Sequence, residues 1–352
     1  MKVPLFSAIL AGGLVLSSPS STANQFNRPA QSQSSISPHS PSDSDFDQAH
    51  QLLQQGKYDD ALAVLRDIET KHPATKALSH ELGLAYYKKG DYPNAITYLK
   101  KARDENPDDG EAVQLLGLSF YLAGRPAEAI APLEKVQTWF PSANVDASYI
   151  LGICYIQTKD YPHARGAFAK MFGVSPDSAA SYLFTARMLL RQDFGPVAEE
   201  YAQKAVSLDP KLPLAHFLLG ELDLYHSKIP EAADEFQREL QLNPGYAPAY
   251  YKLADAYSRI QKFDEAEKLL QRSIWLDSTA TGPYILMGKV LAKKGETVLA
   301  VRSLQRALAM DPNNPVPHHL LGQAYRDLGR SEDAERELKL AAQLEDRQNA
   351  KP

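Results

Sequence analysis

The sequence predicts an all-α protein, a solenoid of tandem helix–turn–helix repeats. Nine alanines recur along the chain: Ala61, Ala95, Ala129, Ala164, Ala198, Ala232, Ala266, Ala300 and Ala334. Every interval is 34 residues except the 35 between Ala129 and Ala164. A period of about 34 residues is typical of arrays of helical hairpins, in which each hairpin buries its apolar side against its neighbours.

Other residues keep the same register. A small residue stands twelve positions before each alanine: Ala49, Gly83, Gly117, Gly152, Ala186, Gly220, Ala254, Gly288 and Gly322. In seven units a proline stands twelve positions after it: Pro73, Pro107, Pro141, Pro176, Pro210, Pro244 and Pro312. Five units have an aromatic residue nine positions before it: Tyr86, Phe120, Tyr155, Tyr257 and Tyr325.

Helix geometry explains these positions. Small residues let two helices approach closely, so we expect Gly83 to lie against Ala95 within one hairpin. A glycine inside a helix costs about 1 kcal/mol relative to alanine, so its recurrence indicates a packing demand. Proline cannot continue a helix, so it is expected to end each second helix.

The repeated positions resemble the tetratricopeptide repeat family, and the segment Glu81 to Pro107 (ELGLAYYKKGDYPNAITYLKKARDENP) is a close match to its pattern. The resemblance implies a right-handed superhelical solenoid whose first helices line an inner groove that binds protein or peptide. The expected units are 42–75, 76–109, 110–144, 145–178, 179–212, 213–246, 247–280, 281–314 and 315–347. The extra residue between Pro141 and Gly152 predicts a longer turn around Ser142 to Asp146.

The first 23 residues resemble a secretory signal peptide, with Lys2, an apolar stretch from Val3 to Leu16 and small polar residues up to Ala23. Its 14 apolar residues are too few to span a bilayer, which needs about 20. We expect cleavage after Ala23, a mature chain without a transmembrane span, and a periplasmic or secreted location. If the leader is not removed, the protein is cytoplasmic or tethered at its N-terminus. Residues 24–41 are rich in Ser and Pro and are expected to form a disordered linker.

Composition and motifs argue against two classes of function, nucleic-acid binding and catalysis. A net charge of −5 gives no electrostatic case for binding nucleic acid. Cys154 is the single cysteine and is expected to be a buried apolar residue. The chain has no glycine-rich phosphate loop, zinc-binding helix motif or nucleophile elbow, and the repeats occupy nearly all of it. We therefore predict no enzymatic activity, no catalytic residues, no cofactor and no metal.

The residues 15, 11 and 8 positions before each alanine are expected to face the groove that the resemblance implies. They are mainly apolar or aromatic in units two to six and polar or charged in units seven to nine. The candidate partner-binding residues are Tyr87, Leu118, Tyr121, Tyr149, Ile153, Arg187, Phe217, Leu224 and Tyr251. The alternative, that these side chains pack between neighbouring first helices, stays open at this point.

Charges at the middle position run Arg187, Glu221, Asp255 and Lys289 in consecutive units. This order favours an ion ladder between units over a site for an anionic ligand such as a carboxylate tail. Two like-charged pairs four residues apart, Arg187 with Arg191 and Lys289 with Lys293, are the features that favour the anionic ligand instead. The lysine–asparagine clamp of chaperone-binding members of the family has no match, because asparagine is absent from all three positions.

The sequence therefore predicts a scaffold or adaptor that binds protein or peptide partners. An accessory subunit of an envelope or polysaccharide assembly or secretion complex is the alternative. The polar surface of the last helix favours a monomer. A weak homodimer through Leu338, Leu340 and Leu344 of the last repeat is the other possibility.

Overall fold

The structure is a computed structural model that describes residues 44–139 and 145–349, all within one compact unit. Over these ranges the secondary structure consists of α-helices without strands, which confirms the predicted all-α class. The expected signal peptide 1–23, the linker 24–41 and most of the longer turn around Ser142 lie outside the described residues.

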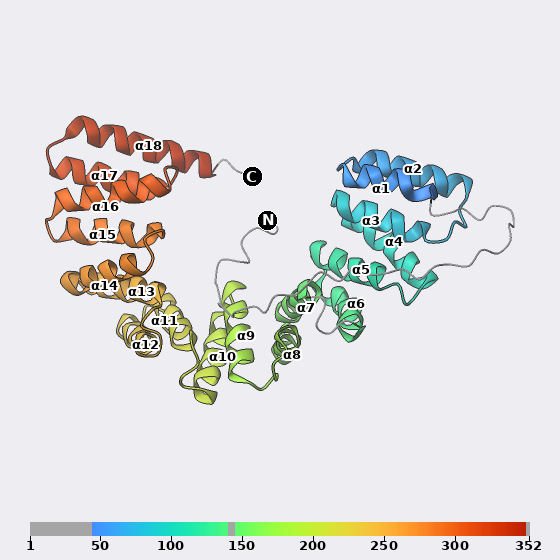
Figure 1. Ribbon diagram of the computed structural model, residues 1–352, viewed down its shortest axis with the longest axis horizontal. Helices are drawn as coiled ribbons and strands as arrows, with labels where there is room; N and C mark the ends of the chain where they lie inside the picture. The colour runs from blue at the N-terminus through green and yellow to red at the C-terminus, as the bar shows by residue number, and fades with distance from the viewer. Residues whose placement is uncertain (1–43, 140–144, 350–352) are drawn as a thin grey trace, which may run out of the picture. The chain divides into compact units, whose positions relative to one another are not determined.

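Short turns join the helices in pairs, which we number as hairpins 1 to 9 (Figure 1). The pairs are α1 (Ser44–Gln54) and α2 (Tyr58–Lys71), α3 (Leu78–Lys89) and α4 (Tyr92–Glu105), α5 (Gly110–Leu122) and α6 (Pro126–Trp139), α7 (Val145–Gln157) and α8 (Tyr161–Phe172), α9 (Ala179–Arg191) and α10 (Gly195–Leu208), α11 (Ala215–Tyr225) and α12 (Ile229–Leu242), α13 (Ala247–Arg259) and α14 (Phe263–Leu276), α15 (Thr281–Lys293) and α16 (Thr297–Met310), and α17 (Pro315–Asp327) and α18 (Ser331–Asn349).

Each helix packs on the next one along the chain, and the first helices of adjacent hairpins also pack on one another. This second kind of contact is sparser between α7 and α9 than at the other junctions, and between second helices it is similarly sparse in the described part of the chain. The first helices therefore form the closer-packed layer. We call the side of this layer that carries the residues 15, 11 and 8 positions before the alanines the first-helix face.

The nine recurrent alanines are buried where the two helices of a hairpin meet, each at most 1% exposed. The expected contact between Gly83 and Ala95 is replaced by a closer one. A Cβ atom on Gly83 would lie 2.6 Å from Leu99 Cδ2, and one on Gly220 would lie 2.6 Å from the Phe236 ring. The glycine thus makes room for the large side chain four residues after the alanine. This side chain is Leu99, Leu133, Phe168, Phe236, Leu304 or Leu338.

Several second helices end where the recurrent proline predicts, whereas α8 ends earlier, at Phe172 before a left-handed Gly173. Helices α4, α10, α12 and α16 each end two residues before a proline. The residue between, such as Asn106 or Asp209, leaves the helical region of backbone conformation as a residue before proline must. Its N–H still bonds back to the last turn, so the helix end loses little.

A repeated hydrogen bond ties the buried aromatic residue of one hairpin to the second helix of the preceding one. Arg66 Nε donates to the Tyr86 hydroxyl at 3.1 Å, and Gln305 Nε2 donates to the Tyr325 hydroxyl at 3.2 Å. The Tyr155 hydroxyl instead donates to Glu134. The polar tip of the aromatic side chain is satisfied in this way while its ring is buried.

The buried apolar side chains form one continuous cluster from Phe46 on α1 to Leu222 on α11. Three smaller clusters follow in the described residues, over Ala232–Ala256, Ala254–Ala300 and Val301–Ala334. The core is therefore more continuous in the N-terminal hairpins than in the C-terminal ones.

Candidate functional site

The first-helix face carries the predicted partner-binding residues, and the structure divides them by exposure. Seven of them are half-buried: Tyr87, Leu118, Tyr121, Tyr149, Phe217, Leu224 and Tyr251. Arg187 is exposed. Ile153 is only 1% exposed, so its side chain serves the packing between helices, and we remove it from the contact surface.

The half-buried aromatic rings rest on the core with part of each ring reaching the surface. Tyr149 lies on Phe168, with 6.3 Å between ring centroids, and Phe217 contacts Phe236 at 5.6 Å. Tyr251 lies against the first turn of α15, close to Gly282. Burial raises the pKa of Tyr87, Tyr121 and Tyr251, so their hydroxyls remain protonated neutral groups near pH 7. The rings therefore form an aromatic floor, defined here as Tyr87, Tyr121, Tyr149, Phe217 and Tyr251.

The expected ion ladder is wrong. Glu221 pairs with Lys252 of the next hairpin at 3.0 Å, and Asp255 pairs with Arg259 on its own helix at 2.8 Å. Among the described residues Arg187 and Lys289 make no ion pair. The carboxylates of the face are therefore neutralised by residues outside the predicted set, and two of its cations are left without a partner.

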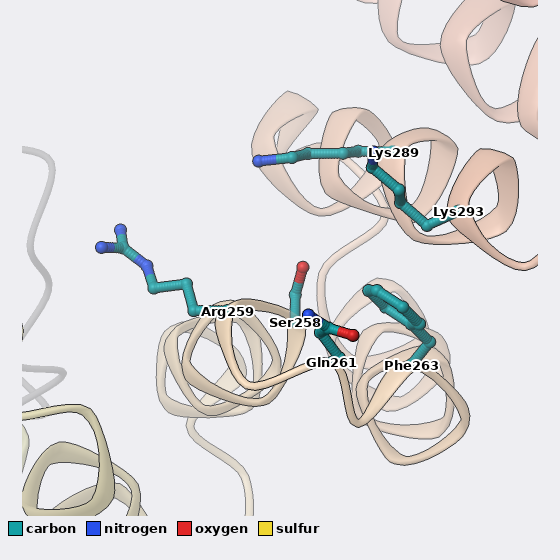
Figure 2. Close-up of a pocket in the computed structure, with 6 residues that line it drawn as sticks. All are labelled: Ser258, Arg259, Gln261, Phe263, Lys289 and Lys293. Atoms are coloured by element: carbon teal, nitrogen blue, oxygen red, sulfur yellow. The ribbon is translucent and has the colours of Figure 1, made fainter.

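A hollow of about 320 Å³ lies where α13 and α14 meet α15 (Figure 2). We call it the basic hollow, and its lining residues are Ser258, Arg259, Gln261, Phe263, Lys289 and Lys293. Sequence reasoning identified Ser258 and Lys289 as face positions but missed Gln261 and Phe263, which come from the turn and the second helix. The available signal was the pair of lysines four residues apart on a segment without acidic residues.

Two histidines elsewhere occupy equivalent places. His216 Nδ1 lies 2.6 Å from Glu235, and its Nε2 lies 3.2 Å from the Pro210 carbonyl oxygen. His318 makes the same two contacts with Glu337 and the Pro312 carbonyl. Because both rings are buried and held to the turn before their helix, they fix the entry of α11 and α17.

Cys154 is buried as expected, and burial raises the pKa of its thiol to about 12, so it is a poor nucleophile. The described residues include no cluster of three or more His, Cys, Asp or Glu side chains that could hold a metal ion. None of the helices in the described ranges has the length and apolar character needed to cross a bilayer.

Comparison with known families and structures gives consistent matches. Profiles described as tetratricopeptide repeat match residues 46–109, 80–144, 224–274 and 317–348, and one described as TPR repeat matches residues 288–329. No curated protein matches the sequence.

Three solved structures illustrate the similarity. MamA is 22% identical, with 47% of this chain and 96% of that chain covered and a TM-score of 0.43. YrrB, described as a TPR protein with an unusual peptide-binding site, is 22% identical over 51% of this chain and 92% of that chain, with a TM-score of 0.44. The match to the APC/C hetero-tetramer Cut9–Hcn1 is 20% identical over 79% of this chain and 54% of that chain, with a TM-score of 0.45.

Proposed function

We propose that this chain, which belongs to the tetratricopeptide repeat family, is a non-catalytic scaffold that binds a protein or peptide partner along its first-helix face. The observation that carries the proposal is the aromatic floor. Its rings recur on the first helices of hairpins 2, 3, 4, 6 and 7, always on the same face.

Half-buried rings suit a binding surface for two reasons. They are already fixed by the core, so little side-chain freedom is lost on binding. Their remaining exposed area is apolar, and covering it contributes about 25 cal/mol per Å². Leu118 and Leu224 extend the apolar surface beside the rings, and the exposed Arg187 adds a charged group to the surface of α9.

The test removes two rings of the aromatic floor by substitution and leaves the helical fold intact. We expect the double variant Tyr121→Ala and Tyr149→Ala to lose most partner capture, because both rings leave the surface. The variant Tyr121→Phe and Tyr149→Phe keeps the rings and is expected to keep capture. Trp275→Ala on α14 is the matched control, since Trp275 is 71% exposed on a second helix.

Capture is measured in the native compartment by placing a photo-crosslinking amino acid at position 187, an exposed position of the same face, in the wild type and in each variant, and identifying the products by mass spectrometry. Circular dichroism of each variant checks that helix content is unchanged. Equal capture by the double alanine variant and the wild type would remove the aromatic floor as the binding site.

We also propose that the protein is exported, on the leader pattern of residues 1–23. N-terminal sequencing of the protein from its native compartment is expected to begin at Asn24. An intact Met1 on protein found in the cytoplasm would contradict export.

We propose that the scaffold acts as a monomer. Leu344 is buried against its own hairpin, and α18 continues to Asn349 with an acidic and basic surface. Sedimentation over a range of concentrations is expected to show one species. A dimer that disappears on Leu340→Glu would show that the last helix is an interface.

A further inference from the structure

The basic hollow is lined by donors of hydrogen bonds and by one aromatic wall. Arg259 and Lys289 project from α13 and α15 to the same side of the hollow, and the Ser258 hydroxyl is directed into the space between the two helices (Figure 2). Gln261 and Lys293 add further N–H donors. None of these six lining residues carries a carboxylate, and although Asp255 pairs with Arg259, the two lysines give the hollow the chemistry of an anion site.

Lys289 and Lys293 on α15 differ from the neighbouring Lys294 in their ion pairs. Lys294 Nζ bonds to Asp264 at 2.8 Å, Glu267 at 2.6 Å and Glu296 at 3.1 Å. Lys289 and Lys293 make no ion pair with any described residue. Lys294 thus engages these three carboxylates and Arg259 engages Asp255, so the positive charge left in the hollow is that of Lys289 and Lys293.

Two features point to a polypeptide carrying carboxylates. Cβ atoms four residues apart on a helix lie about 5–6 Å apart. In an extended chain alternate side chains lie roughly 6–7 Å apart, at about 3.3 Å per residue, so two acidic residues separated by one match the spacing of Lys289 and Lys293. The Phe263 ring offers an apolar wall to the methylene groups of these two acidic side chains.

We propose that the basic hollow binds the carboxylates of an acidic segment of the partner, held in an extended conformation with two acidic residues separated by one. The proposal rests on the proposed function, because it assigns part of the same partner to hairpins 7 and 8. It also gives the two unpaired lysines a role that an ion ladder does not.

The probe is a fluorescein-labelled nine-residue peptide with one Glu-Ala-Glu core, neutral flanks and an amidated C-terminus, and binding is followed by fluorescence anisotropy. The variant Lys289→Gln and Lys293→Gln is expected to bind about five- to thirtyfold more weakly than the wild type, with most of the binding lost at high salt. Replacing the core by Gln-Ala-Gln is expected to abolish binding.

Arg302→Gln and Arg306→Gln is the matched control. These arginines are also four residues apart, exposed and on a helix without acidic residues, but they lie on α16, the second helix of the same hairpin. The control is expected to bind the probe as the wild type does. Equal loss in both double variants would show that net charge alone attracts the peptide and would overturn the site.

Two further binding measurements decide which group of the partner the hollow recognises and whether the aromatic floor takes part. A neutral peptide with a free C-terminus that binds more tightly than the acidic amidated one would overturn the acidic segment in favour of a terminal carboxylate. The Tyr121→Ala and Tyr149→Ala variant is expected to bind the short probe normally. Loss of probe binding only at the lysines therefore tests this inference, whereas loss of partner capture at the tyrosines tests the proposed function.

Discussion

Hairpins 2–6 and hairpins 7–9 share one repeat frame but present different first-helix faces. In the first region the face is largely aromatic and aliphatic and half-buried; in hairpins 2–5 it is continuous with a single large core, and in hairpin 6 Phe217 and Leu224 pack against a smaller cluster. In the second region it carries exposed cations and polar groups, and the core is divided. The buried alanines are the same in both regions. The recurrent residues therefore determine how the hairpins stack, and the residues between them determine which partner the face recognises.

The residue that fills the space over the small glycine varies in the first region and is constant where it occurs in the second. It is leucine in hairpins 2 and 3 and phenylalanine in hairpins 4 and 6, but leucine in both hairpins 8 and 9. Phe168 also meets Phe184 of the next hairpin at 5.1 Å, where the contact between α7 and α9 is sparse. An aromatic contact thus supports the junction that has the least packing between first helices.

The largest expected effect on stability comes from truncating the side chain that fills the space over the glycine, compared between the two regions. Phe168→Ala is expected to lower the free energy of unfolding by about 3–5 kcal/mol, because it leaves a cavity and removes the contact with Phe184. Leu304→Ala is expected to cost about 2–4 kcal/mol within its own hairpin. Urea unfolding followed by circular dichroism measures both. A larger loss for Leu304→Ala would contradict a special role for Phe168 at the junction.

The next comparison uses one repeat position that is polar in both regions. Glu239 is fully buried and accepts from the N–H of Leu214 at 3.0 Å and of Phe217 at 3.4 Å. Ser273, at the same position one hairpin later, donates to the Ala247 carbonyl at 3.0 Å. Glu239→Ala is expected to cost about 1.5–3 kcal/mol, because it leaves the N–H of Leu214 without its acceptor, and Ser273→Ala about 0.5–1.5 kcal/mol.

Thermal and urea unfolding of the two variants, with Glu239→Gln as the variant that keeps an acceptor oxygen, separate hydrogen bonding from charge. If Glu239→Gln is as unstable as Glu239→Ala, the ionised carboxylate rather than the acceptor stabilises the start of α11.

A smaller difference is expected when a methyl group is added at the glycine. Gly152→Ala places Cβ against the rigid Phe168 ring, whereas Gly322→Ala places it 2.5 Å from Leu338 Cγ and 3.2 Å from the Ala334 carbonyl oxygen. Overpacking of about 1–3 kcal/mol exceeds the gain of about 1 kcal/mol in helix propensity at Gly152. We expect Gly322→Ala to be destabilised less than Gly152→Ala, because a leucine can change rotamer and an aromatic ring cannot shrink. A stabilised Gly152→Ala variant would show that hairpin 4 has more room than the structure indicates.

The smallest effect concerns the exposed charges of hairpins 7 and 8. The hydrogen bond from Lys294 lowers the pKa of Asp264 and the partners of Lys294 raise its own pKa. Because the pKa of Asp264 is lower when folded than when unfolded, this contribution is present above the ordinary carboxylate pKa and is lost as the pH falls through the lowered value.

Lys294→Gln is therefore expected to reduce the melting temperature slightly at pH 7 and low salt, and to have no effect at high salt or at a pH below the lowered pKa of Asp264. Differential scanning calorimetry at the two pH values checks this. An effect of equal size at both would assign the change to packing of the lysine stem.

The stacking of the hairpins was predictable because a residue that recurs at a fixed spacing indicates a contact or a helix end that recurs in every unit. Ala95, at a helix contact, and Pro107, after a helix end, are examples. The partner of Gly83 could not, because leucine is common at many helix positions and its approach depends on how the helices cross. The ion ladder failed for a similar reason, since Glu221 pairs with Lys252, which lies outside the three expected positions. Ile153 shows that a face position can be buried by the helix beside it.

The divided core has a consequence for how the molecule opens. Segments that share a continuous apolar cluster exchange their amide hydrogens together, whereas segments joined by few buried contacts open separately. Hairpins 1–5, enclosed in the cluster from Phe46 to Leu222, are therefore expected to behave as one cooperative block. Hairpins 7–9 are expected to open one after another from the C-terminal end, so that proteases reach the basic hollow before they reach the aromatic floor of hairpins 2–4.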